Sequence, residues 1–514
     1  MTTKVQDVCT KSGRPPHPRN FVRQESWFCS SQRILIALCT VLFFCTSAIA
    51  QGPDRSKPPA LGPPPTLNLP PIQHFKLANG LPVVLMEKHQ VPLVQINVLI
   101  KTGRVADPPQ MNGMANMTVA MLDEGAGDRS ALQLADAIEF LGARISTTAG
   151  YHTIRIALHT PLTKLDPALD LLADVVLRPT FPSAELQRLR KQFLTNLVQW
   201  HDQPTTIASV LFDRILYGKK HPYGRTSLGD AATLNKFTVQ ALKRFHATYF
   251  KPNNAVVFVV GDVEPEAIVA KLEAAFGQWQ QGEVPEPRFP KTQQVARRQI
   301  FLVDKPAAAQ SVFRIGRLGV PRKTDDYYAI VVMNTILGGS FTSRLNQNLR
   351  EEHGYSYGAW SFFAFRPLAG PFQAGASVQT DVTDKALIEF MKELNGILAP
   401  IPEEELNRAK NYVALQYPGR FQSVERITGQ LEQLVIFDLP DDYFNEYVKN
   451  ILAVTKEDVH RVAKKYVDPQ KVAIVVVGDR EKIAKGVADL KLGPMKVMTV
   501  EEVLGQVPTV VKSD

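Results

Sequence analysis

Histidine and carboxylate side chains are the main metal ligands that this chain could offer beyond residue 50. All four cysteines lie earlier, so neither a thiolate site nor a disulfide is possible after that point: Cys9, Cys29, Cys39 and Cys45. A helix presents two histidines to one ion only when they stand three or four positions apart. Nine histidines follow residue 50, and no two have that spacing: His74, His89, His152, His159, His201, His221, His246, His353 and His460. We interpret each as a surface or capping residue, with a zinc site assembled from distant histidines as the open alternative.

The sequence offers no clear serine nucleophile. It lacks a G-x-S-x-G elbow, and LGGSFTSRL around Ser340 is followed by a helix-like segment without an obvious base. The same LGGS lacks the Gly-Lys pair of a phosphate-binding loop. We therefore interpret this stretch as a flexible turn that enters a helix.

Two segments in the first half are predicted to be helices. Residues 112–127, NGMANMTVAMLDEGAG, are typical of an amphipathic helix that follows a turn. Residues 130–145, SALQLADAIEFLGARI, open with a capping box of Ser130 and Gln133. The apolar residues of this second helix fall on one stripe: Leu132, Ala135, Ile138 and Leu141.

Strand signals alternate with these helices. HFKLANGLPVVLMEKH (74–89) has alternating apolar residues about Asn79-Gly80, which predicts a β-hairpin. NAVVFVVGD (254–262) and KVAIVVVGD (471–479) are short β-branched runs that end in glycine, as buried strands do. The sequence thus predicts an α+β fold with sheets packed by helices.

The chain contains an internal repeat. TVQALKRFHATYFKPNNAVVFVVGD (238–262) matches TKEDVHRVAKKYVDPQKVAIVVVGD (455–479) at an offset of 217, and FPSAELQRLR (from 181) matches IPEEELNRAK (from 401) at an offset of 220. The proline-bearing stretch QGEVPEPRFPKTQQ divides the two copies. We expect a proline-rich linker at 51–71, a first domain at 72–282, a second linker at 283–295 and a second domain at 296–505.

These segments resemble the insulinase and pitrilysin family of zinc peptidases. FKLANGLPVVLMEKHQVPLVQINVLIKTG, GMANMTVAMLDEGAGDRSALQLADAIEFLGARIST and FPSAELQRLRKQFLTNLVQWHDQP are similar to the family's first domain, and LGGSFTSRLNQNLREEHGYSYGAW is similar to its second. The resemblance covers roughly residues 72–485. It implies two homologous domains, each a mostly antiparallel sheet packed by helices, arranged as a clamshell.

The family's zinc chemistry is not retained at the matching positions. Members of the family use an inverted H-x-x-E-H helix plus a downstream glutamate. In this chain the four functional positions carry other residues: Asn116, Val119, Ala120 and Asn196. Neither asparagine is a good zinc ligand, and valine cannot take a proton from water. The resemblance therefore implies that this chain binds no zinc of its own and hydrolyses no peptide alone.

A second feature of the family is retained. Active members hold the substrate backbone and the oxyanion with an arginine and a tyrosine seven residues later, and these match Arg350 and Tyr357 in LREEHGYSY. The local alternative is that Arg350 pairs with Glu351 or Glu352 at a helix end while Tyr357 is merely packed. Tyr355 is the second choice for the tyrosine.

Retaining the substrate clamp without the zinc predicts a divided enzyme. As in the mitochondrial processing peptidase, this chain would be the non-catalytic, substrate-binding subunit of a heterodimeric zinc metalloendopeptidase. Its Arg350 and Tyr357 would serve zinc held by a sister subunit, and its substrate would be a peptide or unfolded protein. The alternative is a pseudo-peptidase that binds peptides or scaffolds an assembly without any catalytic role, as core subunits of respiratory complexes do.

The amino terminus predicts export. Six basic residues against two acidic ones in the first 33 are followed by the uncharged run ILIALCTVLFFCTSAIA, which is typical of a signal peptide at 1–50 cleaved after Ala50. We expect a periplasmic or otherwise exported protein, with an uncleaved membrane anchor as the weaker alternative. The leader carries +4 of the formal +9 charge, so the remainder gives no support for nucleic-acid binding.

Overall fold

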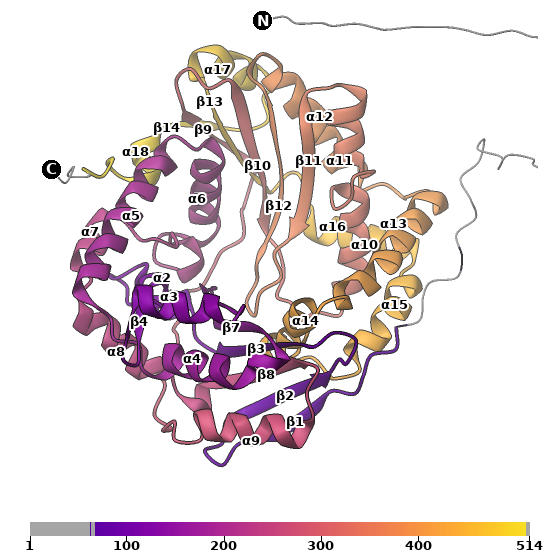
Figure 1. Ribbon diagram of the computed structural model, residues 1–514. Coiled ribbons are helices and arrows are strands. Elements are labelled where there is room, and N and C mark those ends of the chain that lie inside the picture. The colour runs from indigo at the N-terminus through magenta and orange to yellow at the C-terminus, as the bar shows by residue number, and fades with distance from the viewer. Residues whose placement is uncertain (1–61, 63–66, 510–514) are drawn as a thin grey trace, which may run out of the picture. The chain divides into compact units, whose positions relative to one another are not determined.

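The computed structural model describes residue 62 and residues 67–509, so the expected signal peptide and most of the first linker lie outside the described residues. Residues Pro64–Asp514 form one compact unit that contains two six-stranded sheets (Figure 1). The first sheet has the order β1-β2-β8-β3-β7-β6 and the second β11-β12-β10-β13-β9-β14. Most neighbouring strands in both are antiparallel, as expected from the sequence.

The strands of the first sheet are β1 (Gln73–Lys76), β2 (Pro82–Glu87), β3 (Leu93–Ile100), β6 (Arg144–Ala149), β7 (Ile154–Pro161) and β8 (Ala255–Gly261). Those of the second are β9 (Gln299–Asp304), β10 (Gln310–Leu318), β11 (Ser356–Phe363), β12 (Pro371–Gln379), β13 (Ala473–Gly478) and β14 (Met495–Thr499). A small hairpin joins β4 (Gly125–Ala126) and β5 (Arg129–Ser130).

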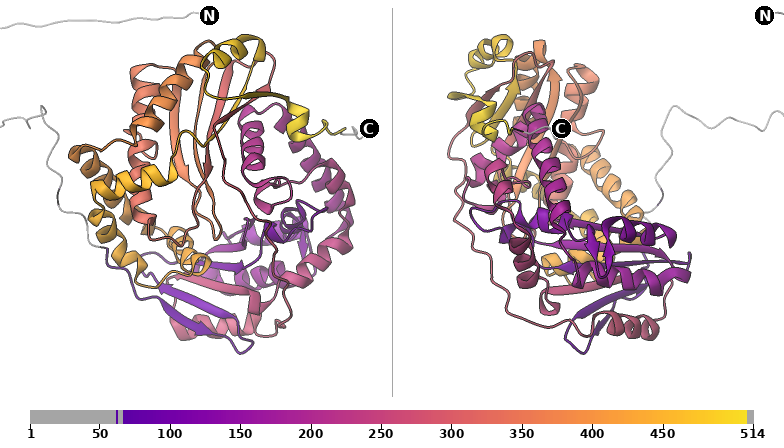
Figure 2. Two further views of the ribbon diagram at one scale, coloured as in Figure 1. Left: turned by 180° about the vertical axis from the view of Figure 1, so that it is seen from behind. Right: turned by 60° about the vertical axis from the view of Figure 1, so that its left-hand side comes forward.

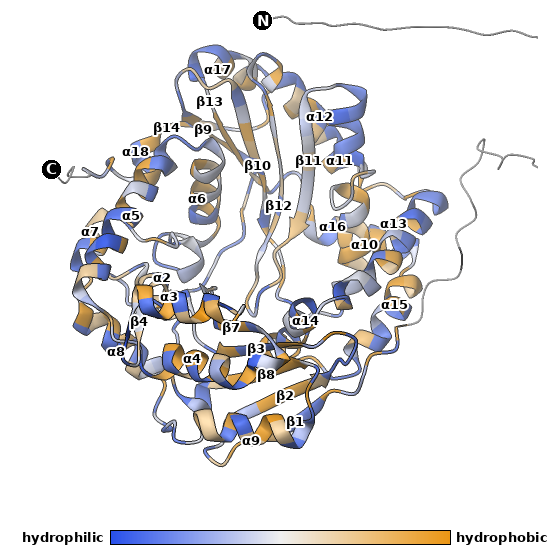
Figure 3. Cartoon of the chain, in the orientation of Figure 1, coloured by the Kyte–Doolittle hydropathy of each residue, from blue (hydrophilic) through white to orange (hydrophobic). Residues whose placement is uncertain are grey.

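Helices connect and cover these strands. In the first half they are α2 (Met114–Ala120), α3 (Ala131–Phe140), α4 (Leu165–Leu177), α5 (Ser183–His201), α6 (Pro204–Tyr217), α7 (Ala231–Lys236), α8 (Val239–Tyr249) and α9 (Pro265–Phe276). In the second half they are α10 (Tyr327–Leu337), α11 (Arg344–Asn346), α12 (Thr383–Gly396), α13 (Glu403–Gln416), α14 (Val424–Phe437), α15 (Tyr443–Ala453), α16 (Lys456–Tyr466), α17 (Arg480–Asp489) and α18 (Val500–Leu504). Helices such as α13 and α15 alternate between polar and apolar residues along their length (Figure 3). None of the helices in the described part of the chain is long and apolar enough to cross a membrane.

The hairpin predicted about Asn79-Gly80 is present. Strands β1 and β2 pair antiparallel, and the Asn79 side chain accepts a hydrogen bond from the Leu81 amide at 3.1 Å. Gly80 has φ +87°, a conformation that glycine adopts without the steric cost of a Cβ.

The two sheets share one strand arrangement. Reading the second sheet from β14 to β11 places β9, β13, β10, β12 and β11 where the first sheet has β2, β8, β3, β7 and β6. The predicted buried strands are β8 and β13, and every residue of both is buried. Their continuous apolar runs follow from burial on both faces.

Two helices are exchanged between the halves. Helix α6 packs on β10 and β13 of the second sheet, while α14 packs on β3 and β8 of the first. These helices occupy equivalent places in the repeat, because both bounds of α14 lie 220 residues after those of α6. Figures 1 and 2 show α6, in magenta, beside the strands of the second sheet. Each half therefore covers one face of its sheet with its own helices and the other with a helix from the opposite half.

Two helix predictions need correction. The helix expected over 112–127 is shorter, Met114–Ala120: a turn follows at 121–124, and β4 begins at Gly125, whose φ of +135° is incompatible with a continued helix. Helix α3 has the predicted capping box, but its stripe is not uniformly buried. Leu134 is fully buried, whereas Leu132 is 72% exposed, so the helix is rotated away from the expected face.

Candidate functional site

Helix α2 carries three of the four positions that hold zinc chemistry in related proteins. The Asn116 side chain donates a hydrogen bond to the Ser227 carbonyl at 2.9 Å. Val119 is buried in the core of the first half, and Ala120 packs against that core. Helix α2 thus packs on the core of the first half, and its side chains at the expected zinc-ligand positions offer no metal ligand.

A distant carboxylate fixes the start of α2. Its N-cap residue, Gly113, has φ +91° and offers no side chain, so Asp107 accepts the amides of Gly113 and Ala115, each at 2.8 Å. Burial raises the pKa of Asp107 to about 7, even though both amide donors favour its ionised form. Sequence reasoning missed this residue, because a cap six positions before the helix has no local spacing signal.

The fourth position, Asn196, lies half-buried on α5. An ion pair between Arg188 of α5 and Glu124 ties this helix to the segment that follows α2. Within the described residues no group of three or more His, Cys, Asp or Glu side chains could hold a metal ion. The donor set at the four positions consists of two amides and two aliphatic side chains, and it does not fit zinc.

The histidines are engaged elsewhere. His246 hydrogen-bonds the Val176 carbonyl at 2.8 Å, and burial lowers its pKa to about 4. His221 caps a short 3₁₀ turn by accepting the Tyr223 amide at 3.0 Å, as the capping interpretation expects. His152 contacts the hydroxyl of the same Tyr223, and burial lowers its pKa to about 4. His152 and His221 therefore come together around an aromatic side chain.

The structure brings Arg350 and Tyr357 together. Arg350 lies in a π-helical segment, Gln347–Glu352, a conformation that recurs at functional sites. Its guanidinium carbon is 5.0 Å from the centre of the Tyr357 ring and 4.6 Å from that of Phe341. The Tyr357 side chain is 89% exposed, so it is not merely packed. Phe341 as a second aromatic partner was not anticipated, since nine residues separate it from Arg350.

Local pairing of Arg350 also occurs. Its Nε lies 3.1 Å from Glu351 Oε1, as the local alternative expected. Both side chains are substantially exposed, and an exposed pair contributes only about 0–1 kcal/mol. Tyr355 is half-buried and stacks on His353, with ring centres 5.0 Å apart. Tyr357 is therefore the tyrosine that faces Arg350.

Each sheet has an open edge strand, β6 in the first sheet and β11 in the second. Strand β6 pairs only with β7, alternates between exposed and half-buried residues, and contacts α2. Strand β11, which carries Tyr357, pairs only with β12. Unpaired edge strands can accept an extended peptide as an additional strand.

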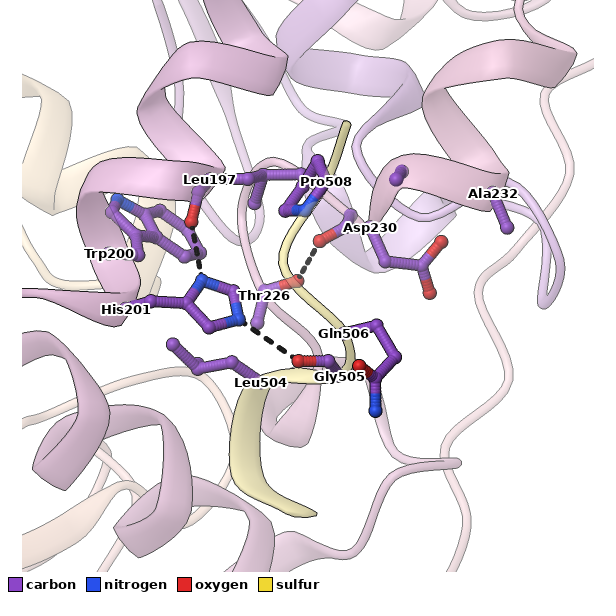
Figure 4. Close-up of a pocket in the computed structure, with 12 residues that line it drawn as sticks. Leu197, Trp200, His201, Thr226, Asp230, Ala232, Leu504, Gly505, Gln506 and Pro508 are labelled. Atoms are coloured by element: carbon purple, nitrogen blue, oxygen red, sulfur yellow. Dashed lines mark hydrogen bonds between the residues drawn. The ribbon is translucent and has the colours of Figure 1, made fainter. Parts of the chain in front are cut away.

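A cavity of about 250 Å³ lies beside α5 (Figure 4). Leu197 and Trp200 line it from α5, Thr226 from the preceding loop of α7, and the chain after α18 closes it. His201 lies 2.9 Å from both the Leu197 and Gly505 carbonyl oxygens and so connects α5 to this closing segment. No feature of the sequence pointed to this cavity, because its walls are more than 270 residues apart along the chain.

Comparison with known proteins assigns the family. Residues 82–226 match the family model described as Insulinase (Peptidase family M16), and residues 236–413 match the one described as Peptidase M16 inactive domain. The chain belongs to the M16 peptidase family. The two M16 matches run from β2 into α13 and thus include α2, α5 and the Arg350 segment.

Individual M16 relatives agree with this assignment. The chain is 28% identical over 300 residues to an uncharacterized zinc protease, YmxG, of Bacillus subtilis, covering 57% of this chain and 70% of that protein. It is 21% identical over 413 residues to the Non-peptidase homolog YmxG of Helicobacter pylori, covering 78% and 93%. The crystal structure of a peptidase M16 inactive domain from Pseudomonas fluorescens superimposes with a TM-score of 0.74 at 28% identity, covering 79% and 98%.

Proposed function

We propose that this chain is the non-catalytic, substrate-binding subunit of a heterodimeric zinc metalloendopeptidase. The observation that carries the proposal is the contrast between its two M16 segments. The zinc positions hold side chains that do not fit a metal, whereas Arg350 and Tyr357 lie in contact on the surface. A chain that has the Arg350–Tyr357 pair but no zinc ligands can take part in hydrolysis only when another chain supplies the zinc.

Arg350 and Tyr357 have the chemistry of an oxyanion clamp. A guanidinium donates two parallel hydrogen bonds and a phenol donates one, and both can meet a carbonyl oxygen that gains negative charge. The rings of Phe341 and Tyr357 beside the guanidinium limit its freedom before substrate arrives. The polarised scissile carbonyl and the attacking hydroxide would come from zinc held by a sister subunit with an H-x-x-E-H helix.

The substrate is an extended peptide or unfolded protein. The open edges of β6 and β11 can form main-chain hydrogen bonds with such a strand irrespective of its sequence. The proposal has the two subunits meet their substrate in the periplasm or outside the cell, and the leader-like amino terminus supports it.

The test compares the purified chain alone with the chain plus an H-x-x-E-H sister. We expect no bound zinc and no peptide cleavage by the lone chain, and cleavage by the pair. Tyr357→Phe in the pair is expected to lower kcat by about 10²-fold, the loss typical of one oxyanion donor. Tyr355→Phe is the matched control and is expected to leave kcat unchanged. Zinc-dependent cleavage by the lone chain would overturn the proposal, as would a loss with Tyr355→Phe alone.

The alternative is a peptide-binding or scaffold protein without a catalytic role. It draws support from the Arg350–Glu351 pair and from the relative of Helicobacter pylori named as a non-peptidase homolog. Under this alternative the two subunits still associate. Substitution of Tyr357 then changes peptide affinity, or has no effect, and leaves kcat unaltered.

A further inference from the structure

A second cavity, of about 150 Å³, lies between α5, α6 and the 3₁₀ turn that bears Arg104. Its walls carry the cationic groups Arg104 and Arg225 and one acidic residue, Asp213. Trp200 and Val210 form an apolar side. The volume is several times what a single water molecule needs, so a small organic group fits.

The charges around this cavity are not paired with one another. Arg104 and Arg225 line it, and Arg366 acts on Asp213 from the opposite half of the molecule. Among the described residues none of these three guanidiniums lies within 4.0 Å of a carboxylate. The Nε atom of Arg104 is buried and has no hydrogen-bond partner at all. Arg225 donates hydrogen bonds to the carbonyl oxygens of Asp107 and Lys220, each at 3.0 Å, and the guanidiniums of Arg104 and Arg366 stack on the Tyr151 ring. These partners carry no negative charge, so the cationic lining still favours an anion.

The acidic residues nearby offset this charge only in part. Burial raises the pKa of Asp213 to about 6, although the charges of Arg366 and Arg104 oppose that shift. Burial raises the pKa of Asp107 to about 7, and both of its carboxylate oxygens accept hydrogen bonds from backbone amides at the start of α2. Arginine stays charged at every physiological pH, so the balance at the cavity is positive.

The cavity lies beside residues linked to two of the lost zinc-ligand positions, Asn116 and Asn196. Ser227 lines it and its carbonyl binds the Asn116 side chain. Trp200 lines it one helical turn after Asn196 on α5. A group bound here would therefore lie next to residues that contact or neighbour these two positions.

We infer that this cavity binds a carboxylate of a peptide. The inference rests on the proposed function, because the carboxylate is taken to belong to the substrate. Arg104 and Arg225 supply charged donors, the hydroxyl of Ser227 can supply a neutral one, and Trp200 contacts the apolar part of the same residue. The chain would thereby prefer peptides that present a free carboxylate, at their C-terminus or on a side chain.

The first experiment uses small probes and the full-length purified chain. N-acetylglycine carries the carboxylate and N-acetylglycinamide lacks it, so binding of each is measured by tryptophan fluorescence and by the shift in the unfolding midpoint. We expect the acid to bind at least about tenfold more tightly than the amide, which corresponds to one charge-assisted hydrogen bond. Equal binding of the two probes, or no binding of the acid, would overturn the inference.

Variants locate the site. Arg104→Gln is expected to abolish the preference for the acid, and Arg225→Gln to weaken it. Arg408→Gln, at a half-exposed position of α13, is the matched control and is expected to change nothing. Unchanged acid binding by Arg104→Gln would contradict the site. Should Arg104→Gln fail to fold because it loses its stacking on Tyr151, Arg225→Gln and Asp213→Asn carry the test.

Asp213→Asn works in the opposite direction. It removes the only acidic residue in the lining, so acid binding is expected to strengthen several-fold. In the unsubstituted chain, acid binding is expected to weaken as the pH rises from about 6 to about 7, because Asp213 and then Asp107, which interacts with Arg104 and Arg225, become ionised. Over this range the three arginines stay charged and the nearby hydroxyls of Tyr151 and Tyr217 stay neutral. No change with Asp213→Asn would place the anion elsewhere.

Peptides distinguish this inference from the proposed function. An extended peptide is tested with a free C-terminus, as its C-terminal amide, and as the amide with one internal glutamate. Preference for the first assigns the terminal carboxylate, and preference for the third assigns a side chain. If N-acetylglycine binds but no peptide does, the cavity stands and the proposed function fails. If all three peptides bind equally, the proposed function stands and the inference fails.

Discussion

At the scale of single residues, an ion pair between the buried Glu432 and the partly exposed Arg155 joins the two halves of the chain. Glu432 of α14 is 1% exposed and accepts hydrogen bonds from Arg155 Nε at 2.8 and 2.9 Å and from Asn97 at 2.6 Å. Arg155 lies on β7 and Asn97 on β3. The pair thus fixes the exchanged helix to the opposite sheet, and a carboxylate left without its partner there would be costly.

Replacing Arg155 with alanine tests this contribution. The carboxylate of Glu432 would retain only Asn97, so we expect the free energy of unfolding to fall by about 2–4 kcal/mol. Arg408→Ala is the control, because its pairing with Glu404 at 3.8 Å is exposed and should contribute less than about 0.5 kcal/mol. Urea unfolding of the three proteins measures the difference. Similar losses of unfolding free energy for both variants would show that the Arg155–Glu432 pair stabilises the fold no more than an exposed pair does.

Residue-level prediction succeeded where the signal was local. The capping box of Ser130 and Gln133 and the turn at Asn79-Gly80 depend on spacings of one to three residues, which the sequence displays directly. Asp107, Phe341 and Glu432 act across six or more residues or across the whole chain. Such contacts depend on the fold, so no spacing rule could reveal them.

At the scale of elements, the exchange of α6 and α14 makes each sheet depend on the other half. Phe212 of α6 is fully buried, and its ring packs against Gly316 on β10. A Cβ added at Gly316 would lie 3.0 Å from the Phe212 ring. The repeat in the sequence predicted equivalent helices, but equivalence does not say which sheet a helix covers.

Phe212→Ala is the variant that tests the exchange. Removing this ring leaves a cavity, so we expect a loss of about 3–5 kcal/mol in the free energy of unfolding. Hydrogen exchange should increase in β10 and β13, which belong to the opposite half of the sequence from Phe212. Ile388→Ala, at a 49% exposed position of α12, serves as the control with little effect. Faster hydrogen exchange confined to the first sheet would contradict the packing of α6 on the second sheet.

At the scale of the whole molecule, one chain combines two M16 repeats with different chemistry. The first repeat contributes an α2 without ligands and a cationic cavity, and the second contributes a half-buried guanidinium beside two aromatic rings. The sequence predicted the fold class, because it is visible in the pattern of residue types, whereas the loss of the zinc ligands stays a prediction. The sequence could not predict the cavity, whose walls come from separate segments of the first repeat.

The most direct test of the account is the turnover of the reconstituted pair carrying Arg350→Ala in this chain. The sister's H-x-x-E-H helix stays intact, so zinc content per pair, measured alongside, is expected to match that of the unsubstituted pair. We predict that kcat falls by about 10²-fold or more at unchanged zinc content, because a donor to the oxyanion is lost. Unchanged kcat in a correctly assembled, zinc-loaded pair would contradict the claim that this chain lends catalytic groups to its partner.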